Sequence, residues 1–240
     1  MSNNKTLKYV NSSNIAPLLD VSAVKCQTVM DEVIAAADVA KKYSCKCAFA
    51  MPNFTPQMRE LLKGSGVSLG GAVGFPSGAD TTAAKVFIAK ELAAMGCDEL
   101  DMVIAVGALK SGMYDYVLDD IKAIREVAEG RIFKCIIEVS YLTDDEIKRA
   151  TELVLRGGAD FVKSGTGWSG ATSVEHIKIM KSIVGNDAKV KAAGGVRDIF
   201  TIDEMVGAGC ERFGIGAANI EAIFKQLSEI ESKQHLASVI

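Results

Sequence analysis

Eight short apolar runs alternate with longer amphipathic segments along this chain of 240 residues, and that alternation limits the fold more than any other feature. Several runs are apolar at almost every position, which is typical of parallel strands covered on both faces. The expected strands are 15–19, 47–51, 67–73, 99–105, 133–139, 160–163, 189–193 and 212–215. Eight strand–helix units without a linker predict an α/β protein with one domain over 1–240, a single (β/α)8 TIM barrel.

The segments between these runs have the pattern of helices. One of them has an apolar face made by residues at helical spacing, Val117, Ile121, Ile124 and Ala128. Thr143, followed by three carboxylates, predicts the start of another helix. A loose tail is expected over 231–240.

An open, doubly wound sheet is the alternative arrangement of such units. That fold often carries a glycine-rich turn after its first strand. Here the first run leads into Leu19-Asp20-Val21-Ser22, which contains no glycine. We therefore expect the barrel.

The composition argues against several classes of partner. The net charge is -3 and the pI is near 5.5, values that do not suit a surface for nucleic acid or anionic lipid. No apolar run is long enough to cross a bilayer. The polar start, Met1-Ser2-Asn3-Asn4-Lys5, lacks the apolar stretch of a secretory signal. We expect a cytoplasmic protein with neither nucleic acid nor membrane as a partner.

Cysteine and histidine give little sign of a metal site or a histidine-based triad. The six cysteines include no CxxC pair. Only two histidines occur, His176 in a helix-like segment and His235 near the end of the chain. We therefore expect no metal ion, and the residues below require no cofactor.

Two lysines end neighbouring apolar runs, and this is the strongest chemical signal in the sequence. Lys163 ends 160–163, and Lys191 lies in 189–193. A buried lysine either loses its charge or finds a partner, and a second cation nearby favours the neutral amine. Lysine becomes a Schiff-base nucleophile in such a setting. A free lysine titrates near ~10.4, so a pKa of about 7 requires roughly 4 kcal/mol from the surroundings.

Carboxylates occur in the same region of the predicted barrel. Asp101 and Glu138 lie inside the expected strands 99–105 and 133–139, and Asp20 and Ser22 follow the first strand. A carboxylate among apolar residues needs a compensating cation. Asp101 between two amines would handle protons during imine formation. The alternative is that Asp101 and Glu138 form buried ion pairs that only hold the barrel together.

Glycine-rich loops follow the last three strands. Loops at these places of a barrel often bind phosphate through backbone N–H groups. The alternative is that the glycines only make turns, and that Arg197 is a solvated helix residue rather than a phosphate ligand. The residues concerned are Thr166 and Gly167, then Gly194, Gly195 and Arg197, then Gly214 and Gly216.

Five segments together resemble the deoxyribose-phosphate aldolase family, and they occur in that family's order over nearly the whole chain. The segments are Gly74-Phe75-Pro76-Ser77-Gly78-Ala79 with Thr81-Thr82, Glu99-Leu100-Asp101-Met102-Val103-Ile104, Gly107-Ala108-Leu109-Lys110-Ser111-Gly112, Ala159-Asp160-Phe161-Val162-Lys163-Ser164 and Val190-Lys191-Ala192-Ala193-Gly194-Gly195-Val196-Arg197. The last segment alone is less specific, because other phosphate-binding barrels share it.

The resemblance implies a cofactor-free class I aldolase that splits 2-deoxyribose 5-phosphate reversibly into glyceraldehyde 3-phosphate and acetaldehyde, in deoxyribonucleotide catabolism. Lys163 then forms the Schiff base, Lys191 lowers its pKa, and Asp101 relays protons. Asp20 and Ser22 match residues that shape the pocket. A phosphosugar is the expected partner, and a homodimer is the expected assembly.

Three departures from the family pattern concern the phosphate end. Ser164-Gly165-Thr166-Gly167 precedes Trp168, where relatives often have Thr-Ser-Thr-Gly followed by Lys or Phe. Ala193 replaces a common serine, and Gly216 and Ala217 replace serines of the last loop. A related Schiff-base aldolase with a different, less phosphate-dependent substrate therefore remains an alternative. So does a non-catalytic phosphate-binding barrel, although a binder needs no buried amine.

Overall fold

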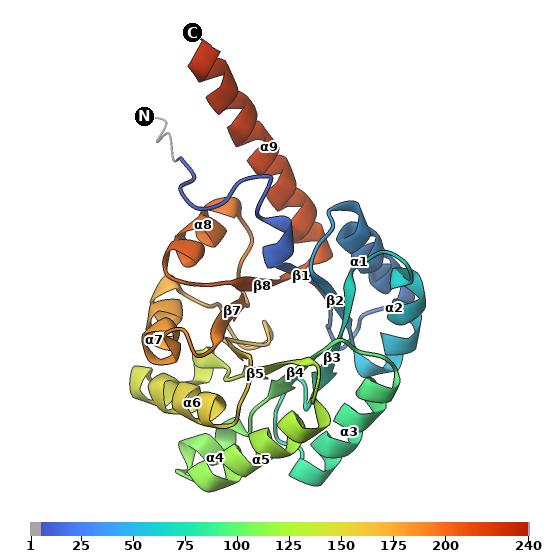
Figure 1. Ribbon diagram of the computed structural model, residues 1–240, viewed down its shortest axis with the longest axis vertical. Helices are drawn as coiled ribbons and strands as arrows, with labels where there is room; N and C mark the ends of the chain where they lie inside the picture. The colour runs from blue at the N-terminus through green and yellow to red at the C-terminus, as the bar shows by residue number, and fades with distance from the viewer. Residues whose placement is uncertain (1–5, 240) are drawn as a thin grey trace.

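Eight parallel strands close into a barrel in chain order, and β8 pairs with β1 (Figure 1). The computed structural model of the chain describes residues 6–239, with side chains described through residue 234. The strands are β1 (Leu19–Ala23), β2 (Cys47–Ala50), β3 (Ser68–Val73), β4 (Glu99–Val103), β5 (Ile132–Ile136), β6 (Phe161–Lys163), β7 (Lys189–Ala193) and β8 (Arg212–Gly216). The predicted (β/α)8 barrel is confirmed, and the open sheet is excluded.

Helices surround the barrel on its outer side (Figure 1). They are α1 (Met30–Lys42), α2 (Thr55–Leu62), α3 (Thr82–Ala94), α4 (Val106–Lys110), α5 (Tyr114–Val127), α6 (Asp144–Arg156), α7 (Val174–Val184), α8 (Ile199–Gly207) and α9 (Ala217–Val239), with short 3-10 turns η1 (Ala16–Leu18), η2 (Pro52–Phe54) and η3 (Val139–Tyr141). Thr143 caps α6 as predicted, because its hydroxyl accepts from the Glu146 N–H. Among the described residues no helix has the length and apolarity to cross a membrane.

The main hydrophobic core lies between the strands and the helices. Outward-facing strand residues such as Val21, Leu100 and Val162 are buried there, and so is the predicted apolar face of α5. Successive residues of a strand point to opposite sides of the sheet, so the residues that alternate with these outward-facing ones face the barrel interior. The register places Asp101 beside Lys134 and Lys163 beside Lys191. Charged side chains therefore meet at the centre of the barrel.

The first and fifth strands differ from the sequence prediction. The first strand was expected over 15–19, but Ala16–Leu18 form η1 and β1 begins at Leu19. Pro17 has no N–H to give to a strand ladder, which explains the delay. Asp20 and Ser22 consequently lie inside β1 instead of after it. In the fifth unit, β5 ends at Ile136, and Glu138 lies beyond it in a left-handed conformation, with φ 56°.

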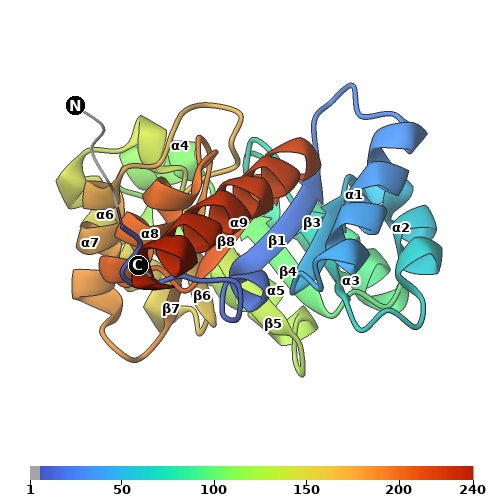
Figure 2. The ribbon, with the colours of Figure 1, turned by 90° about the horizontal axis from the view of Figure 1, so that it is seen from above.

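The predicted loose tail over 231–240 is also wrong for the described residues, because α9 continues as a helix to Val239. Residue 240 lies outside the described part of the chain. The segment 217–239 contains no glycine or proline, so nothing in it breaks a helix. Its first half is anchored by buried Ile220, Ile223 and Leu227. Figure 2 shows α9 crossing β8 and β1 on the outside of the barrel.

Candidate active site

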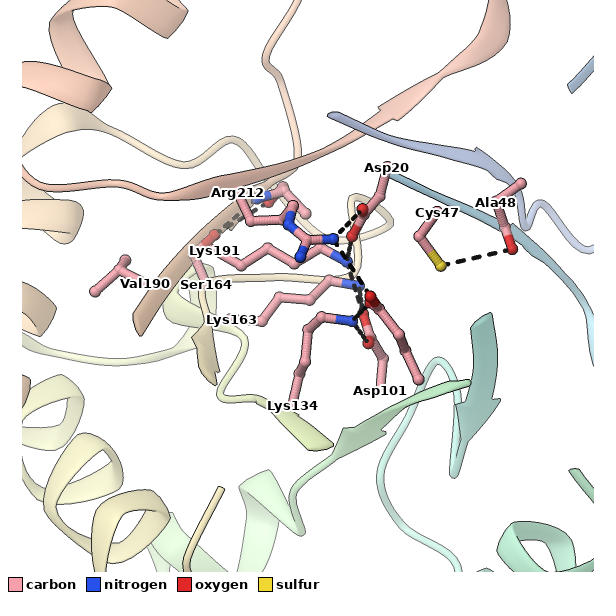
Figure 3. A network of polar contacts seen from close by, with 12 residues as sticks. Asp20, Cys47, Ala48, Asp101, Lys134, Lys163, Ser164, Val190, Lys191 and Arg212 are labelled. Carbon is pink, nitrogen blue, oxygen red and sulfur yellow. Dashed lines mark hydrogen bonds and ion pairs between the residues drawn. The ribbon is translucent and has the colours of Figure 1, made fainter. Parts of the chain in front are cut away.

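Seven charged side chains fill the centre of the barrel, and six of them form a closed ring in which cations and carboxylates alternate. Figure 3 shows Asp20, Asp101, Lys134, Lys191 and Arg212 of this ring, together with Lys163. In order around the ring these are Asp101, Lys134, Glu99, Arg212, Asp20 and Lys191. Three positive and three negative charges make this central charged ring neutral. Lys163 is the seventh group, and it adds a fourth positive charge.

Asp101 lies at the junction of this arrangement. Its Oδ1 accepts from Lys134 Nζ at 2.7 Å, and its Oδ2 accepts from both Lys163 Nζ and Lys191 Nζ at 2.9 Å. Lys191 Nζ also lies 2.6 Å from Oδ2 of Asp20. The two predicted lysines therefore share one carboxylate oxygen, as the sequence led us to expect.

Glu99 and Arg212 complete the ring. Lys134 pairs with Glu99 as well as with Asp101. Arg212 Nη1 lies 3.5 Å from Oε1 of Glu99 and 2.7 Å from Oδ1 of Asp20. All these side chains are buried, so their charges are balanced within the barrel and not by solvent.

The aromatic ring of Phe49 packs against the three amines. Its centroid is 4.6 Å from Lys191 Nζ, 5.1 Å from Lys134 Nζ and 5.7 Å from Lys163 Nζ. A Cβ atom at Gly70 would lie 2.2 Å from this ring, so glycine at that position leaves the space that Phe49 fills. The aromatic ring of Phe49 gives the amines a favourable apolar neighbour that cannot accept a proton.

The surroundings lower the pKa of Lys163 to about 8. Burial lowers it most, and the positive charges of Lys191 and Lys134 lower it further, against the opposing effect of Asp101. Burial alone would raise the pKa of Asp101, but the charges of Lys134, Lys163 and Lys191 hold it well below its usual range. Asp101 is thus ionised in the resting site at neutral pH, while Lys163 loses its proton readily.

A small pocket of about 30 Å³ lies directly at these groups. Its wall includes Asp20, Ser22, Asp101, Lys163 and Lys191. The Lys163 side chain is 11% exposed and that of Lys191 only 1%, so Lys163 is the more accessible amine. The pocket has room for a reacting group of a few atoms beside that amine.

A larger cavity of about 560 Å³ adjoins the small pocket and shares Ser22, Thr166 and Gly214 with it. Its wall contains the remaining predicted binding residues, Gly167, Gly194, Gly195, Arg197 and Gly216. The candidate catalytic and binding residues thus all line the pocket or the cavity, whereas Glu138, the other candidate carboxylate, lines neither. Another cavity, of about 510 Å³, lies beside Arg212, but Lys163, Lys191 and Asp101 do not line it.

The glycines of these loops are required by their backbone conformation. Gly167, Gly194 and Gly195 have φ of 81°, 100° and 76°, values that other residues rarely adopt. Gly165 is fixed by space, because a Cβ there would lie 2.8 Å from Oε1 of Glu138. Gly165, which departs from the family pattern, therefore leaves the space that the buried Glu138 carboxylate occupies.

Glu138 does not join the charged ring and makes no ion pair among the described residues. Its carboxylate accepts instead from the Thr166 backbone N–H at 3.1 Å and from the Thr166 hydroxyl. The alternative of a buried ion pair is therefore wrong for Glu138. Its contacts hold Thr166 at the wall of the pocket.

Trp168 joins two loops across the larger cavity. Its indole Nε1–H donates to the Val24 carbonyl at 3.0 Å, which ties the loop after β6 to the loop after β1. Its ring meets Phe75 edge to face, with centroids 5.9 Å apart. The backbone N–H of Trp168 donates to the hydroxyl of Thr166. The chain of contacts from Glu138 through Thr166 therefore places this indole.

Asp20, Cys47 and Glu99 lie close enough to one another to be considered as metal ligands. Their carboxylates are already paired with Lys134, Lys191 and Arg212. Burial raises the pKa of the Cys47 thiol well above its usual value, so a thiolate ligand is disfavoured. This cluster belongs to the charged ring and does not fit a cation.

The sequence pattern did not identify four parts of this site, namely Lys134, Glu99, Arg212 and Phe49. Alternation along the strands was the available signal. Glu99 and Lys134 each lie two residues from another inward-facing position of an apolar strand, so alternation predicts that they face inward too. Arg212 begins β8 and faces inward in the same way. A charged residue at an inward position of a closed barrel must meet the charges of the other strands.

Comparison with known proteins identifies the family of the chain. The sequence profile described as DeoC/LacD family aldolase matches residues 12–226. A deoxyribose-phosphate aldolase from Sinorhizobium medicae is 44% identical over 204 residues, which cover 84% of this chain and 82% of that protein. Deoxyribose-phosphate aldolase 1 from Staphylococcus aureus is 42% identical and covers 88% of this chain and 92% of that protein.

Solved structures show the same relationship. An aldolase called QR15 superposes with a TM-score of 0.84 at 31% identity, covering 93% of this chain and 98% of that chain. The deoxyribose phosphate aldolase from Aeropyrum pernix, described as a tetramer, gives a TM-score of 0.83 at 26% identity, covering 90% and 93%. The chain belongs to the DeoC/LacD family of aldolases.

Proposed function

We propose that this protein is a class I aldolase that cleaves 2-deoxy-D-ribose 5-phosphate to D-glyceraldehyde 3-phosphate and acetaldehyde, reversibly, through a Schiff base on Lys163. The observation that carries the proposal is an amine of lowered pKa that opens into a pocket beside a carboxylate and a second amine. Two relatives that are 44% and 42% identical to the chain are named deoxyribose-phosphate aldolases.

The lowered pKa supplies the nucleophile. With a pKa of about 8, about one Lys163 side chain in ten is neutral at pH 7, whereas an ordinary lysine is neutral about once in three thousand. The neutral amine attacks the aldehyde carbon of the open-chain sugar, and the carbonyl oxygen takes a proton. Loss of that oxygen as water leaves the iminium ion on Lys163.

The iminium ion then accepts the electrons of the breaking bond. A base removes the proton of the C3 hydroxyl, the C2–C3 bond breaks, and its electron pair moves toward the iminium nitrogen as an enamine. Glyceraldehyde 3-phosphate leaves with the new C3 carbonyl. Protonation of the enamine carbon and hydrolysis by water release acetaldehyde and restore the free amine.

Asp101 and Lys191 are the groups we assign to these proton transfers. Both lie within hydrogen-bond distance of each other, and Asp101 also contacts the Lys163 amine. Lys191 has a further role as a nearby positive charge that lowers the pKa of Lys163. Asp20 in turn holds Lys191 in place through their 2.6 Å ion pair.

The larger cavity is the proposed place of the phosphate. Gly194, Gly195 and Gly216 line it, and so do the first residues of α9, where a helix has backbone N–H groups without helical partners. Arg197 is exposed at its wall and can add a charge. Ala193 and Ala217 give no hydroxyl. We therefore expect a looser hold on phosphate than a serine-lined loop would provide.

The second candidate is a Schiff-base aldolase that acts on a different aldol. Trp168 is the observation that favours it, because an indole lies where relatives often have lysine or phenylalanine and it lines the larger cavity. An indole can stack on a carbon chain but carries no charge for phosphate. Both candidates need the same reactive amine, so they differ only in the acceptor half of the substrate.

The assembly and location of the protein are further parts of the proposal. We propose a homodimer, as the family resemblance implies, that works in the cytoplasm. The Aeropyrum pernix relative is described as a tetramer, so a tetramer is the principal competing assembly. Sedimentation equilibrium at several protein concentrations separates the two.

The test is a steady-state assay with phosphorylated and unphosphorylated 2-deoxyribose, in which acetaldehyde release is followed with an alcohol dehydrogenase. We expect cleavage of both sugars with a modest preference for the phosphate ester, and no cleavage by Lys163→Ala. Activity retained in that variant would contradict the mechanism. Cleavage of neither sugar, with acetaldehyde still bound covalently at Lys163, would favour the second candidate.

A further inference from the structure

The charged ring contains residues that cannot touch a substrate. Lys134 and Glu99 are buried, at 0% and 1% exposure, and neither lines the small pocket or the larger cavity. A buried ion pair is often no more stable than an apolar pair of the same size. The place of the Lys134–Glu99 pair beside Asp101 therefore suggests a role other than stability.

The connection to Lys163 runs through a single carboxylate. Lys134 donates to Oδ1 of Asp101, and Lys163 donates to Oδ2 of the same group. Glu99 in turn holds Lys134 from the opposite side. A change in the charge of Lys134 or Glu99 therefore alters the electrostatic energy of the protonated Lys163 amine, because the groups are close together and little solvent lies between them.

The balance of charge around Lys163 is set by the members of this ring. Asp101 faces it from β4, Lys134 from β5 and Lys191 from β7. From β2 the neighbour is the uncharged ring of Phe49. Asp20 and Arg212 complete the ring from β1 and β8. With Lys163 neutral, the charges of the ring sum to zero, and protonation of Lys163 adds one uncompensated positive charge.

We propose that Lys134 and Glu99 are positioning residues that set the protonation state of the Lys163 amine by keeping the charged ring neutral. This inference rests on the proposed role of Lys163 as the Schiff-base lysine. Loss of the Lys134 charge leaves the ring with one excess negative charge, which favours protonated Lys163. Loss of the Glu99 charge leaves one excess positive charge, which favours the neutral amine.

The two single changes therefore predict opposite effects on the pH dependence. Lys134→Met should move the acid limb of the reaction at Lys163 upward by about one pH unit, and Glu99→Gln should move it downward by about half a unit, because Glu99 lies farther away. The double variant restores a neutral ring, so its acid limb should return toward that of the parent. A residue that only held the fold together would not produce shifts of opposite sign.

The experiment measures imine formation itself. The full chain is incubated with acetaldehyde across a pH series and quenched with borohydride at early times, and the ethyl adduct on the Lys163 peptide is quantified by mass spectrometry. Because acetaldehyde alone is the probe, the result does not depend on which aldol the protein cleaves. Glu99→Gln keeps the shape of the side chain and one of its two acceptor oxygens, so this variant decides the matter even if Lys134→Met does not fold.

A matched control comes from a second buried ion pair outside the ring. Asp120 lies 2.6 Å from Lys85, and both are fully buried between α3 and α5. Asp120→Asn removes a buried carboxylate as Glu99→Gln does, and it should leave the acid limb at its parental pH.

The outcomes separate the inference from the proposed function. Opposite shifts in the single variants, with recovery in the double variant, support the inference. An acid limb that stays in place in Glu99→Gln, or moves in the same direction in both single variants, overturns it while leaving the proposed function intact. Absence of any adduct at Lys163 in the parent overturns the proposed function and the inference with it.

Discussion

Lys163 should reduce the stability of the fold at neutral pH, and its replacement by methionine should therefore stabilise the protein. The native pKa of about 8 lies below the usual value of 10.5, so folding disfavours the charged amine. The difference of about 2.5 pH units corresponds to about 3 kcal/mol. Lys163→Met removes this charge, keeps an unbranched side chain, and leaves Asp101 with Lys134 and Lys191 as partners.

The sign of the pH dependence follows from proton binding. Between pH 8 and 10.5 the unfolded chain binds more protons at Lys163 than the native protein does, so the stability of the parent rises with pH in this window. The penalty is complete below pH 8 and absent above 10.5. Since the variant loses one hydrogen bond to Asp101, we expect it to gain about 1–3 kcal/mol at pH 7, and about 2 kcal/mol less than that at pH 9.5.

Urea unfolding of the parent and Lys163→Met at pH 7 and 9.5 measures this difference. Lys134→Met is the matched control: it removes a buried cation of the ring that holds Asp101 and Glu99, so it should lower the free energy of unfolding by about 3–5 kcal/mol. A Lys163→Met variant that is less stable than the parent at pH 7 would refute the reasoning. So would a stability difference that does not shrink as the pH rises.

Lys191→Met should lose activity at neutral pH and recover part of it at higher pH, because the pKa of Lys163 rises when the neighbouring charge is removed; a pH–rate profile identical to that of the parent would make Lys191 structural. Asp101→Asn should lower kcat more than it changes KM, and a rise in KM alone would contradict its proton-transfer role. Gly216→Ser should lower KM for the phosphorylated sugar by up to about tenfold with little change in kcat, since a Cβ there lies 4.0 Å from the nearest atom and the hydroxyl can add one hydrogen bond. A parent that already prefers the phosphorylated sugar by more than about 10⁴-fold would show that this hydroxyl is not needed. Trp168→Phe removes the indole hydrogen bond to the loop after β1, so it should raise KM for the acceptor aldehyde in the synthetic direction by a few fold, with acetaldehyde trapping at Lys163 unchanged.

The barrel and the reactive pair could be predicted because both depend on local pattern. Apolar runs of strand length identify the strands, and the chain order of a barrel then brings Lys163 and Lys191 side by side. The first strand was misplaced because Pro17 makes a 3-10 turn out of residues that resemble a strand. The helix over 231–239 was missed because its sequence has no strong apolar face, although it has no helix breaker either.

The remaining parts of the site depend on contacts between distant segments. Lys134, Glu99 and Arg212 become a ring only when the closed barrel fixes which residues of eight strands share one layer. Glu138 was expected in a strand near the lysines, but the end of β5 at Ile136 turns it toward Thr166 instead. The bridge from Trp168 to Val24 joins loops that lie 144 residues apart in the chain, and no local pattern predicts it.

The proposed mechanism requires that Lys163 carries the covalent intermediate. The direct measurement is peptide mass spectrometry of the parent after incubation with acetaldehyde and reduction with borohydride at pH 8. We expect an ethyl group on Lys163 at early times, with Lys191 unmodified because its amine is buried and paired with Asp20 and Asp101. An adduct that forms first on Lys191, or on surface lysines with Lys163 unmodified, would contradict this mechanism.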